Sequence, residues 1–213
     1  MTKTCSVLGC GWLGEPLANS LIKKGYSVKG STTSKHKIKL LTSLGVQPYL
    51  LDLEHSSQNI LTFLNSEILI VTIPSKNIKG FKQLIAEIEE STIQKVLFIS
   101  STSVYENSSK IITEEADLAD CSLKKIEQLF LKSNHFETTI IRFAGLFGNQ
   151  RNPGDFFKKS SIIPNPEGVV NMIHRDDCIA IIERIITKNC WNRYLMPALI
   201  HIQNDVLFTP RLT

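Results

Sequence analysis

Short apolar runs alternate with amphipathic segments along the first two thirds of the chain. The runs have the length of strands, and the segments between them place apolar side chains at the spacing of one helix face. The pattern predicts strands at Thr4–Leu8, Tyr26–Gly30, Val46–Leu51, Ile68–Ile73, Val96–Ser100 and Thr139–Phe143. It predicts helices at about Leu13–Lys24, Lys35–Leu44, Ser57–Leu64, Ile78–Glu90 and Ala119–Ser133.

The order of these elements predicts the fold class. Runs such as Ile68–Ile73 are apolar at every position, which is typical of strands that are buried on both faces of a parallel sheet. Strands that alternate with helices over short connections predict a doubly wound α/β fold, with helices on both faces of the sheet. We expect residues 1–143 to form this core.

The pattern changes after Phe143. We expect residues 144–213 to form a small C-terminal segment that is integrated with the core in a single domain. Within it we expect a short strand at Val169–Ile173, a helix at Arg175–Lys188 and one further strand at Leu199–Gln203. Glycine and proline mark the connection before the first of these, at Gly145, Gly148, Pro153, Gly154, Pro164, Pro166 and Gly168.

Composition and charge exclude several classes of protein. The chain has 213 residues, 42% hydrophobic and 21% charged, with a net charge of +4. Its lysines are scattered and aromatic residues do not alternate with them, so we expect no nucleic-acid partner. The longest apolar run is too short to cross a bilayer, and no signal peptide precedes the glycines, so we expect a cytoplasmic protein without a membrane partner. The five cysteines form no C-x-x-C pair and predict reduced thiols, with neither a disulfide framework nor a metal site (Cys5, Cys10, Cys121, Cys178 and Cys190).

A glycine motif at the N-terminus carries the strongest functional signal. The first predicted strand runs directly into Gly9-Cys10-Gly11-Trp12-Leu13-Gly14, and an amphipathic helix follows. In G-x-G-x-x-G the first glycine makes the turn, the second leaves room for a pyrophosphate, and the third packs the helix on the strand. The helix N-terminus then faces the phosphates with unpaired N–H groups. The motif in this context predicts a Rossmann fold that binds a dinucleotide.

The tip of the second strand indicates which nicotinamide cofactor binds. An NAD site has an acidic residue there, about 20 residues beyond the glycines, for the ribose 2′-hydroxyl. Between Ser31 and Lys37 this chain has hydroxyl and ammonium groups instead, among them those of Thr32, Thr33 and Lys35, which favour the 2′-phosphate of NADP over NAD. The alternative is that Lys35, Lys37 and Lys39 form only the solvated face of a helix.

Two more strand ends contribute candidate cofactor contacts. Asp52 follows the third strand, where it either meets the adenine edge or serves as a turn or N-cap residue. Thr72, Ile73 and Pro74 end the fourth strand. If the strand order is 3-2-1-4-5, these residues lie beside the glycine turn at the switch point where ligands bind.

Four segments resemble a known superfamily when taken in order. GCGWLG, FISSTSVY, IIRFAGLFG and NMIHRDD fall within residues 4–177. The sequence resembles the extended or atypical short-chain dehydrogenase/reductases, in their NAD-dependent epimerase/dehydratase branch. The resemblance implies that Ser101 holds the substrate oxygen and that Tyr105 lines the pocket without being the proton donor. It also implies that His174 and Asp177 mainly support the fold. Ser100, at the end of the fifth strand, is a further candidate cofactor contact.

The same resemblance assigns the end of the sixth strand. Phe143, Ala144 and Gly145 match the stretch that runs beside the nicotinamide in the family.

The family's acid/base pair is the main departure. It consists of a tyrosine with a lysine four residues later, on the helix after the fifth strand. Three registers fit that helix, placing Ala119 with Leu123, Asp120 with Lys124, or Cys121 with Lys125, and none supplies a tyrosine. Loss of a positioned general acid costs a factor of about 10²–10⁴ in rate. Lys125 or Lys124 remains a candidate for the ribose contact, and the acid is unidentified.

Three outcomes remain open for the chemistry. Tyr105 or Cys121 replaces the acid, the reaction proceeds without a side-chain acid, or the protein is catalytically silent. The segment after His174 is short, which favours a small or carbohydrate-like substrate over a nucleotide sugar. The sequence thus predicts an NAD(P)-dependent oxidoreductase or epimerase-like enzyme, with a silent NADP(H)-binding sensor or interaction protein as the alternative. Helices beside the fifth and sixth strands are a usual pairing surface in the family, so a homodimer is compatible with the sequence.

Overall fold

The computed structural model describes residues 3–53, 59–106, 112–156, 170–197 and 199–202. Within these residues a sheet of seven parallel strands has the order β3-β2-β1-β4-β5-β6-β9. This is the order expected of a doubly wound sheet, with its switch point between β1 and β4. Its strands are β1 (Thr4–Leu8), β2 (Ser27–Thr32), β3 (Gln47–Leu50), β4 (Ile68–Val71), β5 (Lys95–Ser101), β6 (Glu137–Phe143) and β9 (Tyr194–Leu195).

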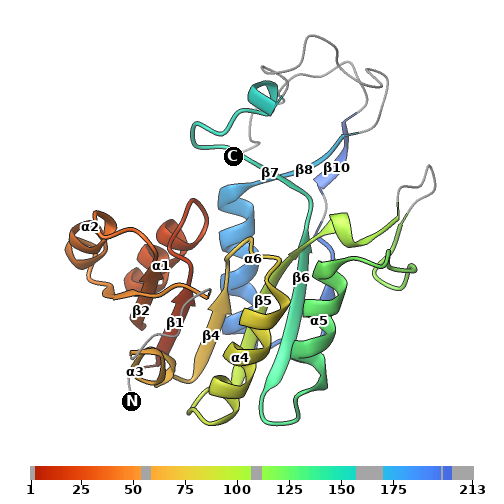
Figure 1. Ribbon diagram of the computed structural model, residues 1–213. Helices are drawn as coiled ribbons and strands as arrows, with labels where there is room; N and C mark the ends of the chain where they lie inside the picture. Colours follow the sequence, from red (N-terminus) through yellow and green to blue (C-terminus); the bar gives the residue numbers. More distant parts are fainter. Residues whose placement is uncertain (1–2, 54–58, 107–111, 157–169, 198, 203–213) are drawn as a thin grey trace.

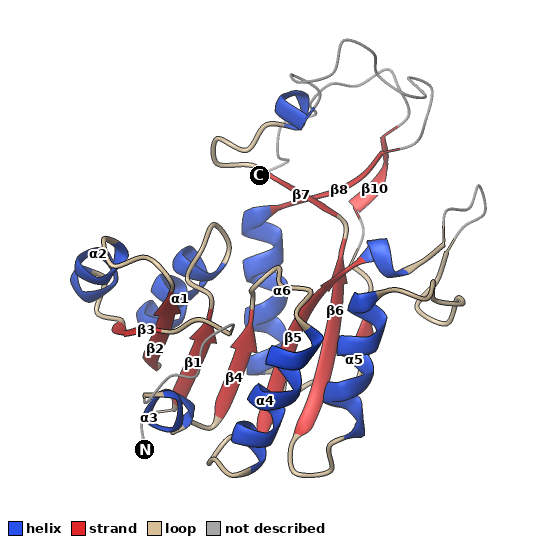
Figure 2. Ribbon diagram, in the orientation of Figure 1, coloured by secondary structure: helices blue, strands red, loops and turns tan. Residues whose placement is uncertain are grey.

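Helices cover both faces of this sheet (Figure 2). Apolar side chains of α1, α2 and α6 form one buried cluster with the sheet, and those of α3, α4 and α5 form a second cluster. Every residue of β4 is buried, because both clusters pack against the centre of the sheet. The helices are α1 (Gly14–Lys23), α2 (Lys37–Ser43), α3 (Ile60–Leu64), α4 (Ile78–Glu89), α5 (Ser122–Lys132) and α6 (Arg175–Thr187), with short 3-10 turns η1 (Thr102–Val104) and η2 (Pro153–Phe156).

A second, smaller sheet lies beyond the carboxyl ends of β5 and β6 (Figure 1). It contains β7 (Gly145–Phe147), β8 (Val170–His174) and β10 (Leu199–Ile202). β7 pairs with β8 in parallel, and β8 leads directly into α6. The chain therefore leaves the core at the end of β6, forms this small sheet, which we call the cap, beyond the carboxyl edge of the main sheet, and returns through α6.

The predicted fold class is confirmed, with small differences at the ends of elements. The strand predicted at Thr4–Leu8 is β1 without change, and β5 is one residue longer at each end than predicted. The helix predicted at Ser57–Leu64 begins outside the described residues, and its described part is α3. The two short strands β7 and β9 were not predicted, because two or three residues carry too little periodicity. No helix in the described ranges is long and apolar enough to cross a bilayer.

Candidate functional site

The glycine turn joins β1 to α1 at the switch point. Gly9 has φ +101°, a conformation that glycine adopts at little cost, and a Cβ there would meet the side chain of Ile73. The backbone N–H of Gly9 donates to Ser31 Oγ at 2.9 Å. The carbonyl oxygen of Gly9 accepts from Thr72 Oγ1 at 2.7 Å. Side chains from the ends of β2 and β4 therefore fix the turn from both sides.

The other two glycines of the motif have different surroundings. A Cβ on Gly14 would run into the carbonyl oxygen of Gly9 and lie 2.7 Å from Thr72 Oγ1, so this glycine allows α1 to pack closely on the turn. A Cβ on Gly11 would meet nothing within 4 Å. Gly11 is therefore unnecessary for packing, and its lack of a side chain keeps space open above the turn.

Two backbone N–H groups lie between this open space and the start of α1. Those of Trp12 and of Leu13, the N-cap of α1, donate no hydrogen bond among the described residues, and no side chain caps the helix. Unpaired N–H groups and the positive end of the helix dipole together favour an anion. A cofactor pyrophosphate fits this cradle, since the turn leaves room for it and supplies donors.

The tip of β2 is partly used to build the turn. Ser31 is buried against Gly9, and Thr32 Oγ1 accepts from the backbone N–H of Ser34 at 3.1 Å. Thr33 and Lys35 are exposed beyond them.

Lys37, at the start of α2, reaches back over the glycine turn. Its Nζ lies 3.2 Å from the carbonyl oxygen of Cys10 and 2.8 Å from Glu15 Oε2. The sequence offered two interpretations of Lys37, an ammonium group near the tip of the second strand or part of a solvated helix face. Its contacts with Cys10 and Glu15 arise only in the folded chain.

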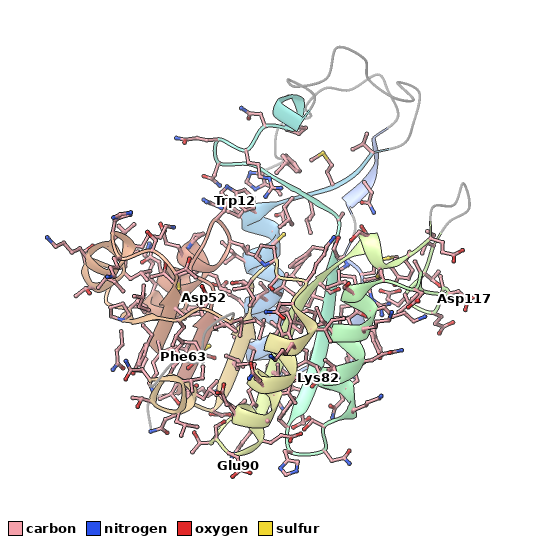
Figure 3. All side chains as sticks on the ribbon, in the orientation of Figure 1. Trp12, Asp52, Phe63, Lys82, Glu90 and Asp117 are labelled. Atoms are coloured by element: carbon pink, nitrogen blue, oxygen red, sulfur yellow. The ribbon has the colours of Figure 1, made fainter. Side chains whose placement is uncertain are left out.

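The end of β4 lies beside the turn, as the strand order predicts. Thr72 and Ile73 contact Gly9 directly, and Pro74 is exposed just beyond them. Asp52 is exposed after β3 (Figure 3). Thr72 and Ile73 therefore adjoin the glycine turn, as predicted for residues at the cofactor wall.

A buried polar network lies at the ends of β5 and β6. Ser100 Oγ donates to Glu127 Oε1 at 2.5 Å, and Glu127 forms an ion pair with Arg142 at 2.7 Å. Arg142 Nη1 donates to the hydroxyl oxygen of Tyr105 at 2.7 Å. Ser100, predicted to contact the cofactor, and Tyr105, predicted to line the pocket, therefore also help to tie β5, α5 and β6 together.

The segment that carries the family's acid/base pair has other partners here. Cys121 is the N-cap of α5, and its Sγ accepts from the backbone N–H of Lys124 at 3.4 Å. The Lys124 ammonium donates to the carbonyl oxygen of Leu118 at 3.1 Å. Lys125 pairs with Asp120 at 3.0 Å, and both side chains are more than half exposed. In each of the three registers that fit this segment, the position of the family's tyrosine therefore falls at or before Cys121, the N-cap of α5.

Ser101 and the end of β6 lie at the carboxyl edge of the main sheet. Ser101 Oγ accepts from the backbone N–H of Ser103 at 3.1 Å and so caps η1. Phe143 and Ala144 are buried, and Gly145 is exposed where β6 passes into β7.

His174 stabilises the start of α6. Its Nδ1 accepts from the backbone N–H of Asp176 at 3.2 Å, which makes it the N-cap of that helix. The imidazole also packs edge-on against Phe147, at 5.2 Å between ring centroids. A Cβ on Gly148 would run into the same ring. These contacts suit the supporting role that the resemblance implied.

A tight hairpin from the cap lies over the glycine turn. Gly148 and Arg151 exchange backbone hydrogen bonds of 3.0 and 3.2 Å, and Asn149 and Gln150 between them have φ values of +48° and +70°. Two consecutive positive φ values define a type I′ turn. The Cζ of Arg151 lies 5.4 Å from the centre of the Trp12 ring.

The hairpin, the glycine turn, α1, α2 and α6 line an open hollow of about 500 Å³, which we call the Trp12 hollow (the position of Trp12 is labelled in Figure 3). Arg175 lies in its wall, with Cζ 5.3 Å from the Trp12 ring centre. Sequence analysis missed Arg151 and Arg175, because both come from the C-terminal segment and reach the site only through the fold. The wall is formed by Gly11, Trp12, Glu15, Pro16, Lys37, Asn149, Gln150 and Arg175.

Burial makes the cysteine of the turn unreactive. The pKa of the Cys10 thiol is raised to about 12, mainly by burial and also by Glu15, with Lys37 acting in the opposite direction. A thiol with this pKa is protonated at neutral pH and is a poor nucleophile. Within the described residues, no group of three or more His, Cys, Asp or Glu side chains could hold a metal ion.

Comparison with known proteins places this site in context. Protein YeeZ from Escherichia coli (strain K12) is 29% identical over 201 residues, which cover 86% of this chain and 73% of YeeZ. UDP-glucuronic acid 4-epimerase from Bacillus cereus, solved with NAD, superposes with a TM-score of 0.76 at 18% identity, over 94% of this chain and 80% of that one. A short-chain dehydrogenase/reductase superfamily protein from Agrobacterium tumefaciens with bound NAD gives a TM-score of 0.70 at 14% identity, over 92% of this chain and 77% of that one.

The sequence itself matches a family model over more than half of its length. Residues 4–124 match the NAD binding domain of 6-phosphogluconate dehydrogenase, and they contain the glycine turn, β1 to β5 and the start of α5. The chain belongs to this family of NAD-binding Rossmann domains, and its structural neighbours include epimerases and short-chain dehydrogenase/reductases.

Proposed function

We propose that this protein binds NADP(H) at the glycine turn and uses it as an oxidoreductase or epimerase-like enzyme. The observation that carries the proposal is the space above Gly11, which faces the unpaired N–H groups of Trp12 and Leu13. A pyrophosphate in this space would complete the hydrogen bonding of the first turn of α1. Thr72 and Ser31 hold the turn in shape before the ligand arrives.

The preference for NADP rests on charge at the tip of β2. A carboxylate that would select NAD is missing between Ser31 and Lys37, and Lys35 and Lys37 supply ammonium groups. Cations near the ribose favour the dianionic 2′-phosphate.

The chemical step requires a substrate near the ends of β5 and β6. The cofactor, when bound, supplies or accepts a hydride. Ser101 lies at the end of β5, where its hydroxyl would orient a carbonyl or alcohol oxygen. Phe143, Ala144 and Gly145 would form the wall beside the nicotinamide. The short C-terminal segment favours a small or carbohydrate-like substrate.

A second function is a catalytically silent NADP(H) sensor or interaction protein. The observation that favours it lies at the start of α5, where the family has its acid/base pair. The cap of α5 carries no tyrosine, and Lys124 and Lys125 contact other groups of the protein. Tyr105 is likewise bound to Arg142.

One experiment tests binding and separates the two functions. The protein is titrated with NADPH and NADH by calorimetry, and NADPH consumption is then followed with a panel of aldehydes, ketones and sugars. We expect both cofactors to bind, NADPH more tightly, and at least one carbonyl to be reduced. Binding without consumption across the panel supports the sensor, and no heat with either cofactor overturns the proposal.

A further inference from the structure

The backbone hydrogen bonds at the start of α1 have a gap. The N–H groups of residues 15 and 17 donate to the carbonyl oxygens four residues earlier, at 3.1 and 3.2 Å. The bond between these two would run from residue 16 to the carbonyl oxygen of Trp12, but residue 16 is Pro16, which has no N–H. The helix therefore supplies no donor of its own to the Trp12 carbonyl oxygen at this position, and a backbone carbonyl normally has one.

The start of α6 supplies a donor to this oxygen. Arg175 is the first residue of α6, and its Nη1 donates to the Trp12 carbonyl oxygen at 3.4 Å. The same guanidinium lies over the Trp12 ring, with Cζ 5.3 Å from the ring centre, so Trp12 lies beside the first turn of α6 (Figure 3). Arg175 Nε is 3.8 Å from Asp176 Oδ1, which leaves Nη1 directed to Trp12. Arg175 thus joins α6 to the start of α1 at one peptide group.

That peptide group also carries one of the two N–H groups above the glycine turn. The peptide between Trp12 and Leu13 is trans and planar, so its C=O and its N–H point in opposite directions. A hydrogen bond that fixes the Trp12 carbonyl on one side therefore fixes the direction of the Leu13 N–H on the other. The cationic donor also polarises the peptide, which makes the Leu13 N–H a stronger donor. This N–H donates no hydrogen bond among the described residues and is available to a ligand above Gly11.

We propose that Arg175 is a positioning residue for the cofactor pyrophosphate: by holding the Trp12 carbonyl oxygen, it directs the Leu13 N–H toward the phosphates. The inference rests on the proposed cofactor site and adds to it a residue from the segment that carries the cap, because β8 leads directly into α6. NADH and NADPH share the pyrophosphate, so the contribution of Arg175 to binding is the same for both cofactors.

Pro16 allows this role to be tested by rescue. Pro16→Ala restores the backbone N–H that can donate to the Trp12 carbonyl oxygen, so this variant should no longer need Arg175. Arg175→Met removes the guanidinium donors and keeps an unbranched side chain that can still pack on the Trp12 ring. Calorimetry measures the affinity for NADH and for NADPH in the wild type, the two single variants and the double variant, which together form a double-mutant cycle. Arg184→Met, which removes an exposed arginine from the last turn of the same helix, is the matched control.

We expect Arg175→Met to lower the affinity for NADH and for NADPH by about tenfold each, since one hydrogen bond to a charged group is misdirected. Pro16→Ala alone and Arg184→Met should stay within about twofold of the wild type. In the Pro16→Ala background, Arg175→Met should cost less than about threefold.

Three results would overturn the inference. Arg175→Met could leave both affinities unchanged, which would make the contact purely structural. It could weaken NADPH alone, which would place Arg175 at the 2′-phosphate. It could cost the same factor with and without Pro16, which would mean that Arg175 acts through its charge or touches the ligand directly. Failure of both cofactors to bind the wild type would overturn the proposed cofactor site, and this inference with it.

Circular dichroism checks that each variant is folded. Should Arg175→Met fail to fold, Arg175→Gln takes its place in the same cycle. Its amide keeps a polar group beside Asp176, but the side chain is too short to reach the Trp12 carbonyl oxygen as Nη1 does. The same rescue by Pro16→Ala then decides the question.

Discussion

Glu127 and Arg142 form a two-point ion pair between α5 and β6. Arg142 Nε and Nη2 donate to the two carboxylate oxygens of Glu127 at 3.1 and 2.7 Å, and both side chains are at most 3% exposed. The same carboxylate accepts from Ser100, and the same guanidinium donates to Tyr105. The pair therefore sets the spacing between the ends of β5 and β6, which border the candidate substrate region.

Removing the charge of Glu127 should destabilise the fold strongly. In Glu127→Gln the size is kept, but the Arg142 guanidinium remains buried without its counter-charge. Breaking a buried pair in this way costs about 3–5 kcal/mol in the free energy of unfolding. Lys125→Gln is the control, because it breaks the exposed pair with Asp120, which contributes about 0–1 kcal/mol. Urea unfolding of both variants measures the difference, and similar losses in the two would contradict the assigned role.

Substitutions of Gly11 and of Gly14 should have different effects on cofactor affinity and on stability. Gly11→Val places a side chain in open space, so the melting temperature should stay near that of the wild type while NADPH affinity is lost. Gly14→Ala pushes a methyl group into the Gly9 carbonyl, so stability should fall together with affinity. Thermal melts with NADPH titrations test both variants. A folded Gly11→Val protein that binds NADPH normally would place the pyrophosphate elsewhere.

The sequence predicts the core of this fold because each of its elements is locally consistent. β1, the glycine motif and α1 follow one another within residues 4–23, so periodicity and motif give the same answer. The strand order then follows from the rules for parallel sheets with short connections. The strand order thus predicts that Thr72 and Ile73 lie beside Gly9, and in the structure both contact it.

The remainder of the site depends on contacts that no local pattern encodes. Arg175 lies 163 residues beyond Trp12, whose carbonyl oxygen it contacts. Lys125 and Asp120 pair at the surface, although the resemblance placed that lysine among candidates for the ribose. The preference of a helical side chain for one neighbour over another is a tertiary property, and periodicity does not report it.

Tyr105→Phe should affect stability more than turnover. The hydroxyl of Tyr105 accepts from Arg142 Nη1, and its loss leaves that donor, among the residues that the structure describes, with a 3.3 Å contact to the Glu114 carbonyl oxygen. We expect a loss of about 1–3 kcal/mol in the free energy of unfolding. With a substrate from the carbonyl panel, kcat should stay within about tenfold of the wild type, since removal of a true general acid costs about 10²–10⁴. A larger fall in kcat would identify Tyr105 as the replacement acid.

Alkaline pH should destabilise the protein through its buried thiols. Burial raises the pKa of Cys5, and raises the pKa of Cys10 and of Cys178 to about 12. In the unfolded chain a cysteine thiol has a pKa of about 8.5, so the unfolded state loses these protons at a lower pH than the folded state. The stability that they contribute is complete below that pH and is lost as the pH rises toward the folded pKa. The free energy of unfolding should therefore fall between about pH 9 and 12, and Cys178→Ala should reduce the slope of that fall.

Thiol labelling tests the same burial without unfolding the protein. At pH 8 an aromatic disulfide reagent should react with Cys121 and Cys190, which are partly exposed, well before it reaches the three buried thiols. Peptide mass spectrometry identifies the labelled positions. Cys10 is the informative position, because it belongs to the glycine turn and its Sγ packs closely against β2. A Cβ on Gly30 of that strand would lie only 2.6 Å from this sulfur atom. Rapid labelling of Cys10 in the absence of denaturant would mean that the turn opens readily, and a turn that opens could not keep the cradle above Gly11 formed before the cofactor arrives.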